Sequence, residues 1–189
     1  MRVYADETPV YLNEARRFGR SKKGHRIFRL RPHHARRLTL HVYIKEDRVL
    51  HWDLSSKNAN DAEVLRVALG AAQKWTDGDV LLWDRLGRSG RARHPKAQHY
   101  NPEAIDAIEC AGGAVVHLSP KGKYLDPCEL LFNDLKENNL RRTPRKWDLP
   151  TLKVAISRYM RQVAPAHLAG FFRARANGRD LIRAGLLRD

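Results

Sequence analysis

The sequence predicts an α/β fold with a mixed sheet, and three observations lead to that fold class. Segments of β type come first and follow one another closely, as in an antiparallel meander. Beyond residue 60, helix-type and strand-type segments alternate, which favours parallel strands joined through helices. The chain has 189 residues, 42% of them hydrophobic and 30% charged, which suits a soluble domain with one substantial core.

The meander is predicted from the N-terminal part of the chain. Residues 3–12, VYADETPVYL, are rich in β-branched and aromatic side chains and predict a strand. A basic turn then leads to a short strand near residues 27–30. Residues 36–56 contain two segments in which apolar and polar side chains alternate, separated by an acidic turn. Together these segments predict an antiparallel meander of about three strands.

The rest of the chain alternates between helices and strands. Apolar side chains on one face predict a helix from about residue 60 to residue 72, and DVLLWD (79–84) has the pattern of a buried strand that ends in an acid. Further helices and strands are predicted, in order, at residues 102–112 (helix), 114–120 (strand), 127–140 (helix), 151–162 (helix) and 165–175 (helix). We expect residues 1–146 to form a catalytic domain and residues 147–189 a helical extension.

The charge balance indicates a nucleic-acid partner. The chain has 36 Lys and Arg residues against 21 Asp and Glu residues, a formal charge of +15. Such an excess attracts phosphate backbones. No segment is apolar enough for a membrane helix or a signal peptide, so we expect no membrane contact. Cys110 and Cys128 lack the spacing and partners of a zinc site, which favours two reduced, structural thiols.

Three acids occupy positions that suit a metal site. Asp6 lies within the first predicted strand, Asp84 ends the DVLLWD strand, and Glu129 begins a predicted helix. If the two strands are neighbours, Asp6 and Asp84 lie close together, and like charges at that distance need a cation between them. Carboxylate oxygens suit Mg²⁺ or Mn²⁺. Two such ions can activate a nucleophile and stabilise a leaving oxygen in phosphoryl transfer.

Each acid also has a structural explanation. Asp6 could be an edge or turn residue, Asp84 could cap the following loop, and Glu129 could stabilise the positive end of a helix dipole. Asp126 is an alternative ligand to Glu129, although its place before Pro127 suits the turn that leads into the helix. The combination of the three acids with the basic charge favours the catalytic interpretation.

Four stretches in this order resemble the catalytic domain of DDE transposases of the mariner-like and related bacterial insertion-sequence superfamily. The resemblance covers roughly residues 2–142, and the segment QVAPAHLAGFFRAR also resembles the C-terminal helices of such enzymes. The matching stretches are ADETPVYL (5–12), RRFGRSKKGHR (16–26), LLWDRLG (81–87) and VVHLSPKGKYLDPCELLFNDLK (115–136). In the last of these, LDPCE matches the family pattern Leu-Asn-Pro-x-Glu.

The resemblance implies a ribonuclease-H-like fold and a catalytic triad of Asp6, Asp84 and Glu129. These side chains would bind two Mg²⁺ (or Mn²⁺) ions, which support DNA nicking and the attack of the freed 3′ hydroxyl on target DNA. Transposon ends and target DNA would be the partners, and a homodimer would be the acting form. The place of action would be a bacterial cytoplasm or nucleoid, or a nucleus. We expect five basic residues to contact phosphates: Arg88, Arg91, Arg93, Lys121 and Lys123.

The sequence departs from the family pattern in three places. Arg85 follows the second acid, where the family usually has Asn. The interval from Asp84 to Glu129 is longer than usual in the family, and the basic segment 86–101 accounts for the excess. Only five residues precede Asp6, so we expect the helix-turn-helix DNA-binding region to be absent or separately encoded. A transposase-derived, catalytically inactive nucleic-acid-binding protein and a nuclease without strand transfer remain alternatives.

Overall fold

The computed structural model describes residues 1–12, 23, 36–56, 61–84, 101–118, 125–142 and 148–176. The strand predicted near residues 27–30 lies outside this part of the chain. The described strands are β1 (Arg2–Tyr11), β2 (Arg37–Ile44), β3 (Val49–Ser55), β4 (Val80–Asp84) and β5 (Ala114–Leu118). The described helices are α1 (Asp61–Ala72), α2 (Pro102–Cys110), α3 (Cys128–Asp134), the π-helix η2 (Leu135–Leu140), α4 (Leu149–Gln162) and α5 (Pro165–Arg175).

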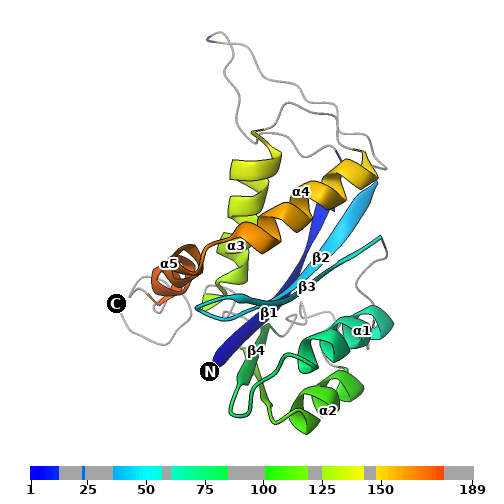
Figure 1. Ribbon diagram of the computed structural model, residues 1–189, viewed down its shortest axis with the longest axis vertical. Coiled ribbons are helices and arrows are strands. Elements are labelled where there is room, and N and C mark those ends of the chain that lie inside the picture. The colour runs from blue at the N-terminus through cyan, green and yellow to red at the C-terminus, as the bar shows by residue number, and fades with distance from the viewer. Residues whose placement is uncertain are drawn as a thin grey trace.

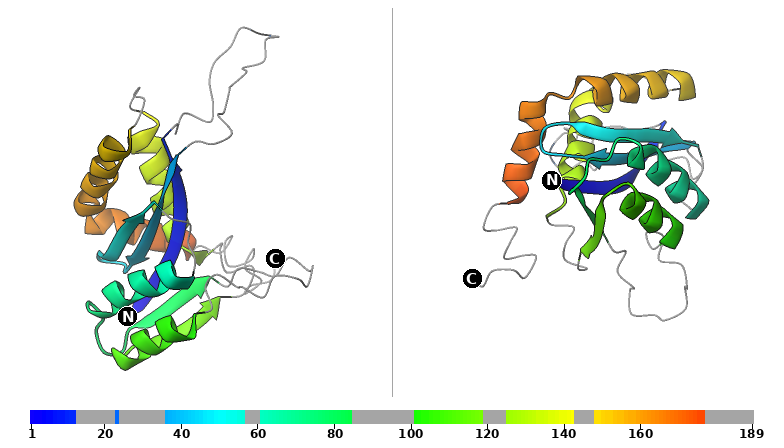
Figure 2. Two further views of the ribbon diagram at one scale, coloured as in Figure 1. Left: turned by 90° about the vertical axis from the view of Figure 1, so that its right-hand side faces the viewer. Right: turned by 60° about the horizontal axis from the view of Figure 1, so that its bottom comes forward.

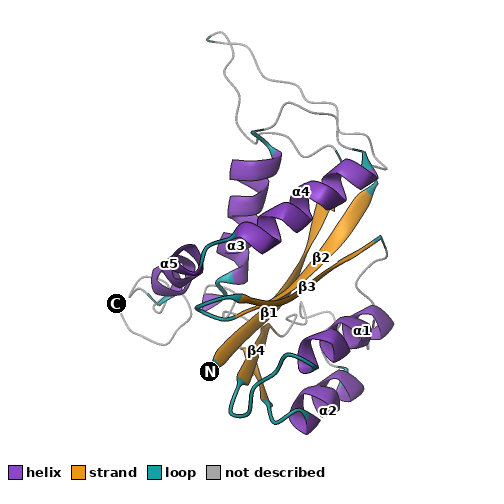
Figure 3. Ribbon diagram, viewed as in Figure 1, coloured by secondary structure: helices purple, strands orange, loops and turns teal. Residues whose placement is uncertain are grey.

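The five strands form one mixed sheet in the order β3-β2-β1-β4-β5 (Figure 3). Strands β1, β2 and β3 are antiparallel neighbours, while β4 is parallel to β1 and β5 is parallel to β4. The predicted fold class, a three-strand antiparallel meander followed by parallel strands and flanked by helices, is therefore confirmed. The parallel connections after β1 run through α1 and α2, as such connections require.

Helices cover both faces of the sheet (Figures 1 and 2). Helices α1 and α2 pack together on one face, and α3, α4 and α5 lie on the other. The fold is thus a three-layer arrangement with the sheet in the middle. None of the helices in the described residues is both long and apolar enough to cross a bilayer.

Side chains of β1 alternate between the two layers. Val3 and Ala5 belong to the buried cluster under α1 and α2, whereas Tyr4 and Val10 belong to the cluster on the opposite face. A strand with both faces covered should carry apolar residues at most positions. Asp6 and Glu7 interrupt that pattern in the middle of a central strand, which marks the point where the sheet meets the candidate site.

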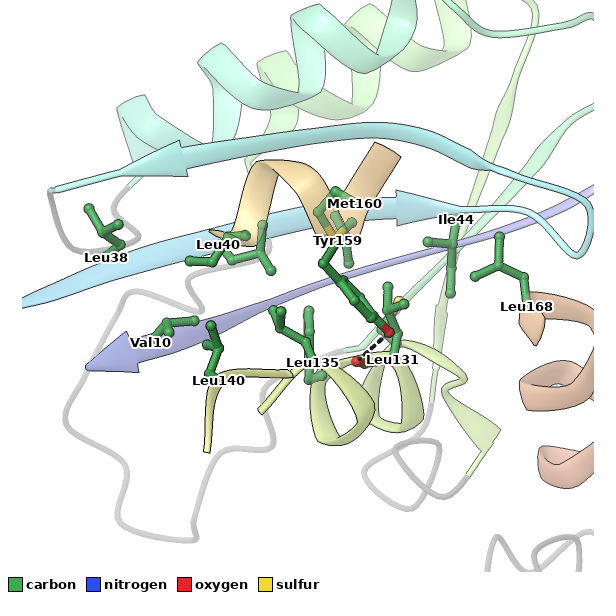
Figure 4. Close-up of a cluster of buried hydrophobic side chains, with 14 of the residues drawn as sticks. Val10, Leu38, Leu40, Ile44, Leu131, Leu135, Leu140, Tyr159, Met160 and Leu168 are labelled. Atoms are coloured by element: carbon green, nitrogen blue, oxygen red, sulfur yellow. Dashed lines mark hydrogen bonds between the residues drawn. The ribbon is translucent and has the colours of Figure 1, made fainter. Parts of the chain in front are cut away.

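The larger core joins the meander to the C-terminal helices (Figure 4). Leu38, Leu40 and Ile44 of β2 pack against Leu131 and Leu135, while α4 and α5 close the cluster from outside. The buried side chains from these two helices are Leu152, Ile156, Tyr159, Met160, Leu168 and Phe172. The sequence-based division of the chain at residue 146 stays a prediction, but α4 and α5 share a core with the sheet.

Candidate catalytic site

The backbones of Asp6 and Asp84 lie side by side at the centre of the sheet. Strands β1 and β4 are parallel, and Ala5 is the register partner of Trp83. Asp6 follows Ala5 and Asp84 follows Trp83, so each acid is the next residue beyond the same paired position. The side chain of Asp84 lies outside the part of the chain that the structure describes.

The Asp6 carboxylate stands in a strongly negative environment. By alternation Asp6 lies on the same face as Tyr4 and Val10, the face covered by α3. Burial raises the pKa of Asp6 well above its ordinary value, and the negative charges of Asp126, Glu7 and Glu129 raise it further. One hydrogen bond opposes this effect, because the backbone N–H of Glu7 donates to Asp6 Oδ1 at 2.8 Å.

Glu129 approaches this environment from the first turn of α3. Its side chain is exposed, and its charge is one of those that raise the pKa of Asp6. Helix α3 packs against β1, which carries Asp6. The structure thus brings Glu129 and Asp6 within electrostatic reach of each other, on the same side of the sheet.

Asp126, the alternative ligand considered from the sequence, is buried, and the sequence did not predict that burial. Its side chain is 2% exposed, and its Oδ1 accepts a hydrogen bond from Cys128 N at 2.8 Å, in the turn predicted for it. Among neighbouring charges, Asp126 has the largest effect on the pKa of Asp6, ahead of Glu7 and Glu129. Burial and then the charges of Asp126 and Asp6 also raise the pKa of Cys128. The sequence shows that Asp126 precedes a helix, but not that it is buried beside β1.

A lysine also reaches this face of β1. Lys136 Nζ donates a hydrogen bond to Thr8 Oγ1 at 2.6 Å, and Thr8 lies two residues beyond Asp6 on the same face. Lys136 follows Glu129 by about two helical turns, a spacing that places both on one side of a helix. The seven-residue interval between Glu129 and Lys136 is the sequence signal that could have indicated this placement.

Glu7 faces the other layer, as alternation along β1 requires. Its charge acts on Tyr43, whose hydroxyl has a pKa raised first by burial and then by Glu7. Tyr43 belongs to the cluster under α1 and α2. On this face Arg66 of α1 makes ion pairs with Asp53 and Glu63. Glu7 is therefore separated from Asp6 by the sheet, although the two acids are adjacent in sequence.

The donor set fits a hard divalent cation, although the described side chains alone do not complete a site. Carboxylate oxygens are the preferred ligands of Mg²⁺ and Mn²⁺. Asp6 is surrounded by negative charge, which a cation would offset. Within the described ranges, no group of three or more His, Cys, Asp or Glu side chains is arranged to hold a metal ion. The five basic residues predicted from the sequence to contact phosphates lie outside the described part of the chain. They are Arg88, Arg91, Arg93, Lys121 and Lys123.

Comparison with known proteins identifies the fold through solved structures. No protein-family model and no curated protein sequence matches the chain. The Mos1 mariner paired-end complex with Mn matches with a TM-score of 0.74 at 14% identity, over 97% of this chain. The Mos1 paired-end complex with the left transposon end matches with a TM-score of 0.72 at 14% identity, also over 97% of this chain. The catalytic domain of Mos1 mariner transposase matches with a TM-score of 0.61 at 13% identity.

The chain covers different fractions of the length of these matched proteins. The chain covers 54% of the transposase chains in the two complexes, so it spans about half of their length. It covers 78% of the catalytic-domain structure. At such low identities the likeness concerns the fold. The chain therefore has the ribonuclease-H-like α/β fold of the Mos1 mariner transposase catalytic domain.

Proposed function

We propose that the chain is a metal-dependent polynucleotidyl transferase of the DDE transposase type, with Asp6, Asp84 and Glu129 as its catalytic acids. The observation that carries the proposal is the pairing of β1 with β4, which brings the backbones of Asp6 and Asp84 together. The charge of Glu129 acts on Asp6 from α3. The shared fold with Mos1 transposase and the charge of +15 support a DNA substrate.

The three acids would hold the metal through their carboxylate oxygens. Mos1 structures with Mn and with Mg support a divalent ion, and two ions are proposed from the resemblance. When bound, such ions lower the pKa of a nucleophilic water or hydroxyl and stabilise the leaving oxygen. Asp6 has to lose its proton to act as a ligand. Because its pKa is raised, metal binding is expected to strengthen as the pH rises. Transposon ends and target DNA, a homodimeric form and a separately encoded helix-turn-helix segment belong to the same proposal.

Nicking of supercoiled plasmid DNA in the presence of Mn²⁺ tests the catalytic acids. Asp84→Asn and Asp6→Asn should each lower the nicking rate by about 10³-fold or more. When catalytic groups act as a unit, the loss of any one of them removes most of the activity. Glu7→Gln is the matched control, since Glu7 is adjacent to Asp6 but lies on the other face, and it should keep the parental rate. All variants should still bind DNA. A parental nicking rate in Asp84→Asn would sink the assignment.

Metal titration separates the enzyme from the inactive nucleic-acid-binding alternative. Calorimetric binding of two divalent ions by the parent, lost in Asp6→Asn, supports the enzyme. Binding of DNA without any metal binding supports the inactive alternative. A strand-transfer assay with pre-cleaved ends then distinguishes a transposase from a nuclease, because joining needs a 3′ hydroxyl nucleophile and cleavage needs only water.

A further inference from the structure

The outward face of α4 is a cationic surface that the catalytic site does not use. From residue 149 to residue 176 the sequence contains no Asp or Glu, although it contains several Arg residues. Lys153, Arg158 and Arg161 are exposed on α4. None of these three makes an ion pair or a hydrogen bond with another residue in the described ranges. Their charges are therefore available to a partner.

The face is shaped as well as charged. A depression of about 450 Å³ runs along α4 between these cations and is also lined by Val154, Ser157 and Gln162. It continues into a pocket of about 730 Å³ between α4 and the end of α3. The carboxylate of Asp134 in that pocket already accepts hydrogen bonds from Tyr159 and Asn138, at 2.7 and 2.6 Å. Among the described residues, no acid lines the depression itself.

We propose that this outward face of α4, defined by Lys153, Arg158 and Arg161, binds the phosphate backbone of DNA. The proposal rests on the function proposed above and adds a second contact surface to it. Lys153 and Arg161 are separated by about 12 Å along the helix axis. That length corresponds to roughly three to four nucleotides of one DNA strand. Ser157 lies between Lys153 and Arg158, and Gln162 follows Arg161. Both side chains can also bond phosphate oxygens.

A protein partner fits this face less well. In the part of the chain that the structure describes, Val154, 59% exposed, is the sole apolar side chain that lines the depression. A second copy of the chain would bring the same cations face to face, which is unfavourable. Cations that lie along one helix without ion-pair partners are instead the charge pattern expected of a surface that binds a phosphate backbone.

The α4 face is rigidly connected to the candidate catalytic site. Tyr159, on the inner side of α4, donates a hydrogen bond to Asp134 at the C-terminal end of α3. Helix α3 carries Glu129 in its first turn. Arg175 Nε, in α5, donates to the backbone oxygen of Asp126 at 3.1 Å. DNA bound on α4 would therefore have a fixed position relative to Glu129, which gives the contact a positioning role.

The test is the salt dependence of DNA binding by the full chain. The double variant Arg158→Gln/Arg161→Gln removes two charges from the α4 face. The matched control, Arg2→Gln/Lys74→Gln, removes two exposed charges from β1 and from the turn that follows α1. Dissociation constants for a short DNA duplex are measured by fluorescence anisotropy over a range of NaCl concentrations. We expect the α4 variant to bind on the order of 50-fold more weakly at ~0.1 M salt, with a log–log slope shallower by about 2.

The control variant distinguishes DNA binding at the α4 face from general attraction of DNA to the positive charge of the chain. It should bind within about threefold of the parent, because exposed charges beyond the Debye length are screened. If the parent binds DNA and the two double variants are equally affected, the α4 inference is overturned and the proposed function stands. If the parent does not bind DNA, both fail. If the α4 variant changes only the oligomeric state in light scattering, the face is a protein contact and the inference is overturned.

Discussion

Asp6 and Glu7 are adjacent carboxylates that the sheet separates into different surroundings. Asp6 faces α3 together with Asp126 and Glu129, and burial and these charges raise its pKa. Glu7 faces the α1 and α2 layer, where its charge acts on Tyr43. The charge of Glu7 also raises the pKa of Asp6, so a metal bound at Asp6 would relieve repulsion from all three neighbouring carboxylates. The chemistry of this pair is therefore decided by the direction of each side chain rather than by residue type.

Asp79 is a further buried carboxylate, and its role is structural. Its carboxylate is 2% exposed and forms an ion pair with Lys45, which is 1% exposed. Thr76 donates to the same Asp79 oxygen through its backbone N–H at 3.0 Å and its hydroxyl at 2.8 Å. Burial alone would raise the pKa of Asp79, but the hydrogen bonds from Lys45 and Thr76 outweigh it and lower the pKa to about 2.

Asp79→Asn is expected to destabilise the fold by about 3–5 kcal/mol at neutral pH, because it leaves Lys45 as an uncompensated buried charge. The pKa of Asp79 is lower in the folded chain than its ordinary value of 3.8. The stabilisation is thus fully present above that value and is lost as the pH falls through about 2. Urea unfolding at several pH values measures the difference between parent and variant.

Asp77→Asn is the control for this experiment, since Asp77 is exposed and two residues away in the same turn. It should change the free energy of unfolding by less than about 0.5 kcal/mol. A stability gap between parent and Asp79→Asn that persists unchanged below pH 2 would contradict the ion-pair explanation.

At the scale of elements, local patterns predicted most strands and helices. Alternation between Leu38 and Ile44 identified β2, because one side of each strand must face a core. Pro165 and Arg175 were the predicted limits of α5 and are its observed limits. The predicted helix over residues 127–140 ends instead as the π-helix η2. Leu135 and Leu140 are both fully buried there, and hydrogen bonds that span five residues keep both on the core side.

The site was less predictable than the elements. The pairing of β1 with β4 depends on contacts between residues far apart in sequence, which local patterns do not contain. From the sequence, that pairing was only a condition of the metal-site hypothesis, and the structure shows that β1 and β4 are parallel neighbours. The turn role of Asp126 is local and was predicted, but its burial had no local signal. The effect of its charge on the pKa of Asp6 depends on how α3 packs against the sheet. The catalytic roles of Asp6, Asp84 and Glu129 stay predictions.

The docking of α4 on α3 depends on Tyr159. Its hydroxyl donates to Asp134 Oδ2 at 2.7 Å and lies 3.5 Å from the backbone oxygen of Leu131 (Figure 4 shows the second contact). Tyr159→Phe should lower the free energy of unfolding by about 1.5–3 kcal/mol, as expected for a hydrogen bond to a charged group. Chemical denaturation measures the loss. A double-mutant cycle with Asp134→Asn should give a coupling of about 0.5 kcal/mol or more, and strictly additive losses would rule out the bond as the cause.

At the scale of the whole molecule, two buried clusters flank one sheet and each depends on a different set of helices. The cluster under α1 and α2 takes its side chains from residues 3–108. The larger cluster needs the C-terminal helices, whose buried residues close the face that also carries Asp6. The face that carries Asp6 and the C-terminal helices therefore share one hydrophobic core.

A chain shortened to residues 1–146 is expected to lose cooperative folding. It would expose the partners of Leu152, Ile156, Met160, Leu168 and Phe172, each of which contributes about 1.5–3 kcal/mol by burial. That sum is comparable to the whole stability of a typical domain, about 5–15 kcal/mol. Circular dichroism during heating checks the expectation. A cooperative transition at the parental midpoint would show instead that residues 1–146 fold independently.

Strand β1 is held between an antiparallel neighbour and a parallel one, and this has a consequence for how the chain can change in evolution. Connections between strands can gain or lose residues, because the sheet pairing does not depend on their length. An insertion or deletion of one residue within β1 is different. A deletion before Asp6 would bring Glu7 into the place of Asp6, and an insertion there would bring Ala5 into that place. Either change would send the Asp6 side chain to the other layer. Related chains should therefore vary freely in the spacing between their acids along the sequence, while keeping β1 free of insertions and deletions.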